Sequence, residues 1–437
     1  MNATTRWKAL EPSSLKMNKL PSIHNLWRRI PGMVIFILVI SCGLAYAKSP
    51  VMQMTAEEKE RLKSLSTLPY LQGYFSAPEL TGVIRYNRAL SNKGLTLYAS
   101  GHDGAAYLID MIGHVLHEWH YKLKDIWPEL VAKKIAPFWE NIYLYENGDL
   151  LAIYNHGGII KLDKDSNLLW AYKCPAHHDI DVDENGFIYT LTDDEIQPRE
   201  GLSALDNSIL ILNPEGEPVR KISFLNAMQN SKVPEIQEYF KRVLGIILNG
   251  GEDVFHGNTL EILNGRAAES NPAFKKGNIL VCMLTISSIG VIDPVAGEMV
   301  WMLGPKIWFE GQHNPNLLDN GNILIFDNHF GGSKTQSRVL EFDSQTLQHI
   351  WSYMDEGFYT DTHGTNVRLD NGNTLVVESN TGRIFELTMQ GAIVWEFLNP
   401  HTTGEDNDLI AAVFAAYRIA PPFVSSWLDV EEYQRKY

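Results

Sequence analysis

Histidines recur at similar positions of a repeated sequence pattern. His313 stands eight residues before the glycine of an Asp-Asn-Gly-Asn turn that leads into a short apolar strand. His178 stands eight residues before the glycine of an Asp-Glu-Asn-Gly turn, and His363 stands nine before that of a second Asp-Asn-Gly-Asn turn. A fourth, His256, opens the similar segment His-Gly-Asn-Thr. Because Asn-Gly beside alternating apolar residues predicts a hairpin turn, each histidine is expected at one end of a strand. Repeated units of this kind would bring the four side chains together.

Such a group of histidines has two chemical uses. It can bind a transition-metal ion, whose nitrogen ligands lie about 2 Å away. Alternatively, one imidazole can attack an electrophile while another delivers a proton to the leaving group. Asp179, Glu252 and Asp253 are candidates for orienting histidines in either case. The residues leave both uses open. The remaining histidines of the body lack the register and are expected to be packed or surface residues: His102, His114, His117, His120, His156, His329, His349 and His401.

The elements that must position the histidines form a repeat. From about residue 94 to residue 395, alternating apolar stretches and polar turns give six copies of strand, turn, strand, turn and strand. Five copies end on a tryptophan, namely Trp119, Trp170, Trp301, Trp351 and Trp395. A period of about 40–50 residues with four strands per copy is typical of a β-propeller. We therefore predict an all-β, six-bladed β-propeller domain over 48–437, with a β-sandwich as the less favoured alternative.

Three segments favour helices rather than strands. Residues 222–249 have helical apolar spacing and are expected to form an insertion ahead of His256. Residues 408–418 are expected to form a helix that ends before Pro421 and Pro422. A short helix is expected over residues 56–63.

Residues 1–47 are typical of a targeting segment. Basic residues precede an apolar run from Met33 to Ile40, and Ala-Tyr-Ala ends at Ala47. This order predicts an export signal cleaved after Ala47. Val-Ile-Ser-Cys, ending at Cys42, also fits a lipoprotein site, and an uncleaved membrane anchor is a third form of attachment. We expect an exported protein that is periplasmic or anchored in the membrane facing the periplasm.

Composition excludes several classes of partner and site. The net charge of -15 supplies no basic stripe, which argues against nucleic-acid binding. The three cysteines, one of them in the leader, form neither a disulfide framework nor a zinc-finger spacing. Whether the chain forms a homodimer stays open.

The histidine motifs resemble those of the bacterial arylsulfate sulfotransferase family. The resemblance is carried by His178 before its Asp-Glu-Asn-Gly turn, by Asp-Val-Phe-His-Gly-Asn at 253–258, by Gln312-His313, and by the tail at 417–422. It implies six blades around a histidine-lined channel and transfer of a sulfuryl group from a phenolic sulfate to a phenol, with no nucleotide donor. It further implies that His313 is transiently sulfurylated, while His178 and His256 bind the sulfuryl oxygens or move the phenolic proton. No cofactor and no metal are expected.

One departure from the family pattern is Leu284, which stands where the family places an arginine. An arginine's planar fork suits a sulfuryl group, and losing one such donor typically costs about 10²–10³ in rate. Lys306, Arg338 and Arg368 are candidates to replace it. The departure favours, as an alternative, a non-catalytic propeller that binds a ligand or protein partner at the channel. A quinoprotein dehydrogenase is a third reading, but it normally needs more blades.

Overall fold

The computed structural model describes residues 71–304, 309–329 and 336–430. The predicted leader at 1–47 and the predicted helix at 56–63 lie outside these ranges. All described residues belong to one unit that spans residues 50–437. Within the described ranges, no helix has the length and apolar character needed to cross a membrane.

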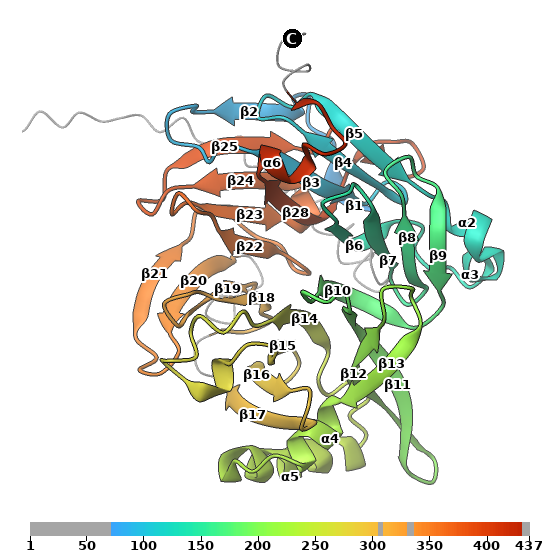
Figure 1. The fold of residues 1–437 in the computed structure, drawn as a ribbon, viewed down its shortest axis with the longest axis vertical. Coiled ribbons are helices and arrows are strands. Elements are labelled where there is room, and N and C mark those ends of the chain that lie inside the picture. The colour runs from blue at the N-terminus through green and yellow to red at the C-terminus, as the bar shows by residue number, and fades with distance from the viewer. Residues whose placement is uncertain (1–70, 305–308, 330–335, 431–437) are drawn as a thin grey trace, which may run out of the picture. The chain divides into compact units, whose positions relative to one another are not determined.

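Four antiparallel sheets are each built from four consecutive strands (Figure 1). The first contains β6 (Trp139–Leu144), β7 (Leu150–Tyr154), β8 (Gly158–Leu162) and β9 (Leu168–Tyr172). The second contains β10 (Ala176–Val182), β11 (Ile188–Arg199), β12 (Leu202–Leu212) and β13 (Pro218–Ser223). The third contains β14 (Gly257–Ile262), β15 (Ile279–Met283), β16 (Ser288–Asp293) and β17 (Glu298–Leu303). The fourth contains β18 (His313–Leu317), β19 (Asn322–Asp327), β20 (Arg338–Asp343) and β21 (His349–Tyr353).

The other sheets combine segments from the two ends of the described chain. One has the order β28 (Val413–Ile419), β3 (Leu95–Ser100), β4 (Ala105–Ile109) and β5 (Val115–His120). Another has the order β2 (Gly82–Tyr86), β25 (Ile393–Leu398), β24 (Arg383–Leu387), β23 (Thr374–Glu378) and β22 (Thr365–Arg368). A small sheet contains β1 (Gly73–Ser76), β27 (Leu409–Ala411) and β26 (Thr402–Thr403). The predicted all-β class is confirmed.

The predicted turns form as the sequence chemistry requires. In the turn before β11, Asp183 Oδ1 accepts the backbone N–H groups of Asn185 and Phe187, both at 2.9 Å. Gly186 adopts a φ of 83°, a left-handed conformation that a glycine tolerates without a Cβ clash. The five predicted tryptophans lie on β5, β9, β17, β21 and β25.

In the part of the chain that the structure describes, the helices are few and mostly short. They are α2 (Leu123–Ile126), α3 (Pro128–Ala132), α4 (Phe224–Gln229), α5 (Pro234–Leu248), α6 (Pro421–Val424) and the 3₁₀ turns η1 (Pro272–Phe274) and η3 (Ser379–Thr381). The predicted insertion over 222–249 is confirmed by α4 and α5. The helix predicted over 408–418 is wrong, because this segment forms β27 and β28. Its apolar run is buried on both faces as an edge strand beside β3, and a short continuous apolar run does not distinguish the two structures.

The first strands of successive sheets contact one another in the order β28, β6, β10, β14, β18, β22, and β22 contacts β28. As edge strands they carry backbone N–H groups that their own sheet does not bond. Carboxylates of the preceding sheet accept several of these groups. Asp179 Oδ2 on β10 accepts the Leu260 N–H of β14, and Glu261 Oε2 on β14 accepts the Leu317 N–H of β18, both at 2.9 Å.

Apolar cores lie between neighbouring sheets. Six clusters of buried side chains each combine residues of two sheets. Pairs drawn from the same cluster are Leu108 with Ile160, Ile153 with Leu210, Leu191 with Val281, Ile289 with Ile325, Leu324 with Val376, and Ile384 with Ile109. This packing and the carboxylate contacts fix the ends of the first strands, where the histidines lie.

Candidate active site

The four predicted histidines lie together. The ring centroid of His178 is 5.5 Å from that of His256 and 5.4 Å from that of His363. The rings of His363 and His313 are 6.0 Å apart. His178 and His313 lie on β10 and β18, while His256 and His363 immediately precede β14 and β22. Strand starts from four different sheets therefore contribute one histidine each.

The backbone at these strand starts is unusual. His178, His256 and His363 have φ angles of 57°, 45° and 57°, and Asn314 beside His313 has 46°. The strand register shifts just after three of the histidines, on β10, β14 and β18. Left-handed φ is uncommon for residues with a Cβ, and such bulges re-aim side chains next to active sites. The bulges thus turn the imidazoles away from the sheet faces and toward one another.

His313 is buried and has a defined tautomer. Its Nδ1 lies 3.0 Å from the carbonyl oxygen of Gly311 and 2.8 Å from Asn328 Oδ1. The Asn328 amide nitrogen donates to the carbonyls of Thr360 and His363, so its oxygen faces His313. Two acceptors at Nδ1 place the proton there and leave the lone pair on Nε2. Burial lowers the pKa of His313 to about 4, so the ring is a neutral base at neutral pH.

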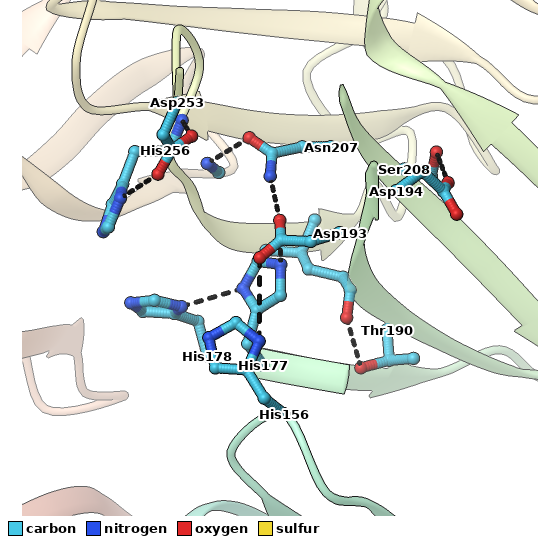
Figure 2. Close-up of polar contacts among 12 residues, drawn as sticks. His156, His177, His178, Thr190, Asp193, Asp194, Asn207, Ser208, Asp253 and His256 are labelled. Atoms are coloured by element: carbon cyan, nitrogen blue, oxygen red, sulfur yellow. Dashed lines mark hydrogen bonds and ion pairs between the residues drawn. The ribbon is translucent and has the colours of Figure 1, made fainter. Parts of the chain in front are cut away.

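His256 has the opposite character. Its Nδ1 lies 2.6 Å from Asp253 Oδ2, and its backbone N–H donates to Asp253 Oδ1 (Figure 2). Burial alone would lower the pKa of His256, but the hydrogen bond and negative charge of Asp253 outweigh burial and raise it. About a third of the side chain remains exposed, at 35%. His256 is therefore suited to donate a proton at the open side of the group.

A second line of polar groups approaches His178 from behind. Its Nδ1 lies 2.8 Å from His177 Nδ1, and His177 Nε2 lies 3.0 Å from Asp193 Oδ1. His156 Nδ1 lies 3.7 Å from Asp193 Oδ2, as Figure 2 shows. His156 is exposed, as expected of a histidine outside the register, but it lies beside this second line of polar groups. A register rule based on turns does not detect it, because His156 lies in the tight turn between β7 and β8.

Glu140 is the acidic residue that the sequence analysis did not single out. It is buried on β6, and its Oε2 accepts the backbone N–H of His178 at 2.7 Å. Its Oε1 lies 3.9 Å from Nε2 of both His178 and His363. Burial raises the pKa of this carboxyl to about 8. A signal for it exists: Glu140 stands eight residues before Gly148 of an Asn-Gly turn, the spacing of His178 and His313.

The structure also places the residues considered for the missing arginine. Leu284 follows β15, and its backbone N–H donates to the carbonyl of His256 at 3.2 Å. Arg338 pairs with Asp327 at 2.8 Å and Arg368 with Glu341 at 2.7 Å, so both already neutralise buried carboxylates. Lys306 lies outside the described residues. Of the three acidic residues expected to orient histidines, which include Glu252, Asp253 does so, whereas Asp179 bonds Asn141 and the backbone of β14.

Comparison with known proteins identifies the family. The family model described as arylsulfotransferase (ASST) matches residues 139–400, which include all four histidines and Glu140. No curated protein sequence matches the chain. Among solved structures, the chain is similar to a protein of unknown function from Bacteroides caccae, with 14% identity, coverage of 74% of this chain and 98% of that one, and a TM-score of 0.45.

Two further structures are similar at the same low level. The Dos1 propeller has 11% identity, coverage of 74% and 76%, and a TM-score of 0.37. BamB from Moraxella catarrhalis has 12% identity, coverage of 77% and 96%, and a TM-score of 0.36. At these identities and TM-scores the similarities assign no function. The family match spans more than half of the sequence and contains the whole histidine group, and the chain accordingly belongs to the arylsulfotransferase family.

Proposed function

We propose that this protein transfers a sulfuryl group from an aryl sulfate to a phenol through a sulfo-histidine at His313. The observation that carries the proposal is the pair of acceptors at His313 Nδ1, which directs the lone pair to Nε2. Membership in the family supports sulfotransferase activity with aryl donors and acceptors. Covalent catalysis of this kind divides one difficult displacement into two easier ones.

In the first step, His313 Nε2 attacks sulfur, and the bond from sulfur to the aryl oxygen breaks. The electron pair of that bond stays on the phenolic oxygen, which takes a proton from His256. A phenol has a pKa of about 10, so proton delivery lowers the barrier to its departure. In the second step, His256 takes the proton of an acceptor phenol, whose oxygen attacks sulfur. The bond between sulfur and Nε2 then breaks and restores neutral His313.

We also propose that the six larger sheets are the six blades of a propeller. The contacts from each first strand to the next, and the apolar clusters between neighbouring sheets, support this arrangement. In a propeller, the first strands line a central channel. A channel of this kind would give an aryl sulfate access to His256 and His313 from one end.

Turnover of aryl sulfates by purified protein tests the proposed function. Para-nitrophenyl sulfate as donor with phenol as acceptor should give ping-pong kinetics. His313→Ala should reduce kcat by at least about 10³-fold, as removal of a catalytic nucleophile does elsewhere. The matched control is His349→Ala, since His349 is exposed on β21 and should leave the rate unchanged. Wild-type protein that is inert toward a panel of aryl sulfates, or His313→Ala with full activity, would overturn the proposal.

A further inference from the structure

We propose that Glu140, His178 and His363 bind one divalent transition-metal ion. Glu140 Oε1 and one ring nitrogen from each histidine lie within 4.8 Å of one another, and all three residues are buried. Two imidazoles and one carboxylate are a donor set that suits zinc or ferrous iron. From the sequence no metal was expected, so this site corrects that expectation.

The distances fit an ion after a small adjustment. Oε1 is 3.9 Å from each Nε2, and the third separation is at most 4.8 Å. The point equidistant from the three atoms is therefore no more than about 2.5 Å from each, whereas zinc bonds to nitrogen and oxygen measure about 2.0–2.2 Å. Movements of a few tenths of an ångström would complete the contacts.

The groups behind the donors have the arrangement that metal-bound histidines require. The carboxylate of Asp193 lies at His177 Nε2 and fixes the His177 proton there. His177 Nδ1 can then only accept, so the proton shared with His178 belongs to His178 Nδ1. This leaves Nε2 as the basic nitrogen of His178, on the side of Glu140. A hydrogen bond from the second ring nitrogen usually orients a metal-bound histidine, and here His177, held by Asp193, accepts that bond.

Glu140 gives an independent indication of a ligand. Its side chain is 1% exposed, and its Oε1 has no hydrogen-bond partner among the described residues. A buried polar atom without a hydrogen-bond partner destabilises the fold and therefore needs an explanation. Its other oxygen holds the backbone N–H of His178, which fixes the carboxyl group so that Oε1 points between the two histidines. A bound cation would satisfy this oxygen.

Three protein ligands leave at least one coordination position open, as in catalytic rather than structural metal sites. His256 flanks His178, and His313 flanks His363, so this position is adjacent to both. An anionic oxygen is the natural fourth ligand for such an ion. If the proposed function holds, that oxygen belongs to the sulfate ester, and the ion neutralises its charge. Metal binding itself does not depend on that function.

Titration of the chelator-treated full chain with Zn²⁺ tests the inference. Calorimetry should detect one equivalent bound to wild type. Glu140→Gln, which can still accept the His178 N–H, should weaken binding by about a hundredfold or more, since even supporting residues typically contribute 10–100-fold. His363→Gly is the second variant, because glycine suits the φ of 57° at that position. The control is Glu261→Gln, which changes a carboxyl on the first strand β14 that faces β18 instead of the proposed donors.

Several outcomes separate the possibilities. Loss of binding in Glu140→Gln and His363→Gly but not in Glu261→Gln supports the site, as do Co²⁺ absorption bands that vanish in the same two variants. Binding of less than a tenth of an equivalent of Zn²⁺ by wild type, or unchanged Zn²⁺ binding by Glu140→Gln, overturns the proposed metal site. His313→Ala should bind Zn²⁺ like wild type. Binding that persists in His313→Ala alongside inactive wild-type protein would reject the sulfotransfer proposal and retain the metal site.

Discussion

Imidazoles of the same residue type acquire different properties from one or two neighbouring atoms each. Burial keeps His313 a neutral base, and Asn328 and the Gly311 carbonyl place its lone pair on Nε2. Asp253 makes His256 a proton donor, because the carboxylate stabilises the cation. Proton transfer and nucleophilic attack require these opposite states at the same pH. The different roles of His313 and His256 therefore depend on the surroundings of each ring rather than on the residue type.

The role of Asp253 gives a prediction at this scale. Asp253→Asn should lower kcat on phenyl sulfate by about 10²-fold, because a weaker acid serves a poor leaving group. On para-nitrophenyl sulfate the loss should be about tenfold or less, since the more acidic nitrophenol departs with little help. Steady-state rates on the two donors measure the ratio. Equal losses on both donors would show that Asp253 only holds the loop, and the exposed Asp319→Asn should change neither rate.

The site could be predicted from the sequence only in part. The spacing to Asn-Gly turns indicated His178, His313 and His363, and the similar segment His-Gly-Asn-Thr indicated His256, because a repeated unit places equivalent residues at equivalent strand ends. Glu140 has the same spacing to an Asn-Gly turn, but it was not predicted because only histidines were considered at that position. The hydrogen bond between Asn328 and His313 is harder to predict, because Asn328 follows the end of β19 and contacts His313 across a hairpin. Sequence spacing carries no information on such cross-strand contacts.

At the scale of elements, the first strand of each sheet presents an edge that must be satisfied from outside. Asp179, Asp181 and Glu261 each accept a backbone N–H of the next first strand. These bonds replace the strand pairing that an edge lacks. The repeat predicted the later strands of each sheet well, through period-two alternation and turns. It missed β6 and assigned β28 to a helix, because both are short buried runs without alternation.

Glu261 allows this interpretation to be tested. Glu261→Leu should lower the free energy of unfolding by about 1–3 kcal/mol, because the Leu317 N–H loses its acceptor. Glu261→Gln keeps an acceptor and should be much less destabilising. Chemical denaturation of the three proteins at pH 6 measures the difference. If leucine and glutamine were equally tolerated, the carboxylate bond would contribute nothing to the contact between β14 and β18.

The same residue predicts a pH dependence. Burial raises the pKa of Glu261 to about 8 in the folded protein, from an ordinary value of 4.5. The folded state then holds the proton more tightly than the unfolded state, so this contribution to stability is present below pH 4.5 and is lost as pH rises through about 8. The stability of Glu261→Gln relative to wild type should therefore increase from pH 5 to pH 9. A difference that is constant with pH would contradict the raised pKa.

At the scale of the whole molecule, the two ends of the described chain complete each other's sheets. β28 pairs with β3, and β2 pairs with β25. Arg418 on β28 pairs with Glu386 on β24 at 2.9 Å and lies over the Trp395 ring. Pairings between residues about 300 positions apart have no local sequence signal, which is why the repeat predicted the sheets but not how the ends join them.

The buried ion pair should contribute to this joining. Arg418→Leu should lower the free energy of unfolding by about 2–4 kcal/mol, because Glu386 remains buried without its countercharge. The matched control Arg266→Leu removes an exposed arginine paired with Asp319, which should leave the unfolding midpoint nearly unchanged. Thermal unfolding followed by circular dichroism compares the two variants. Equal midpoints would show that β28 is held by its strand pairing alone.

The order of basic, apolar and small residues in 1–47 motivates a further proposal, that the protein is exported. Mass spectrometry of the native protein should find an N-terminus after Ala47 or a lipid-modified Cys42, and fractionation should place it outside the cytoplasm. An intact cytoplasmic chain that begins at Met1 would contradict export.

Detection of a sulfo-histidine at His313 is the direct test of the proposed covalent mechanism. Protein mixed with an aryl sulfate in the absence of acceptor is quenched and digested, and the peptides are analysed by mass spectrometry. A covalent mechanism predicts one equivalent of released phenol and one SO₃ group on the peptide that contains His313. The SO₃ group should be lost from this peptide when phenol is added before the quench. Continued turnover without this adduct, or an adduct on another histidine, would contradict the proposed role of His313 as the nucleophile.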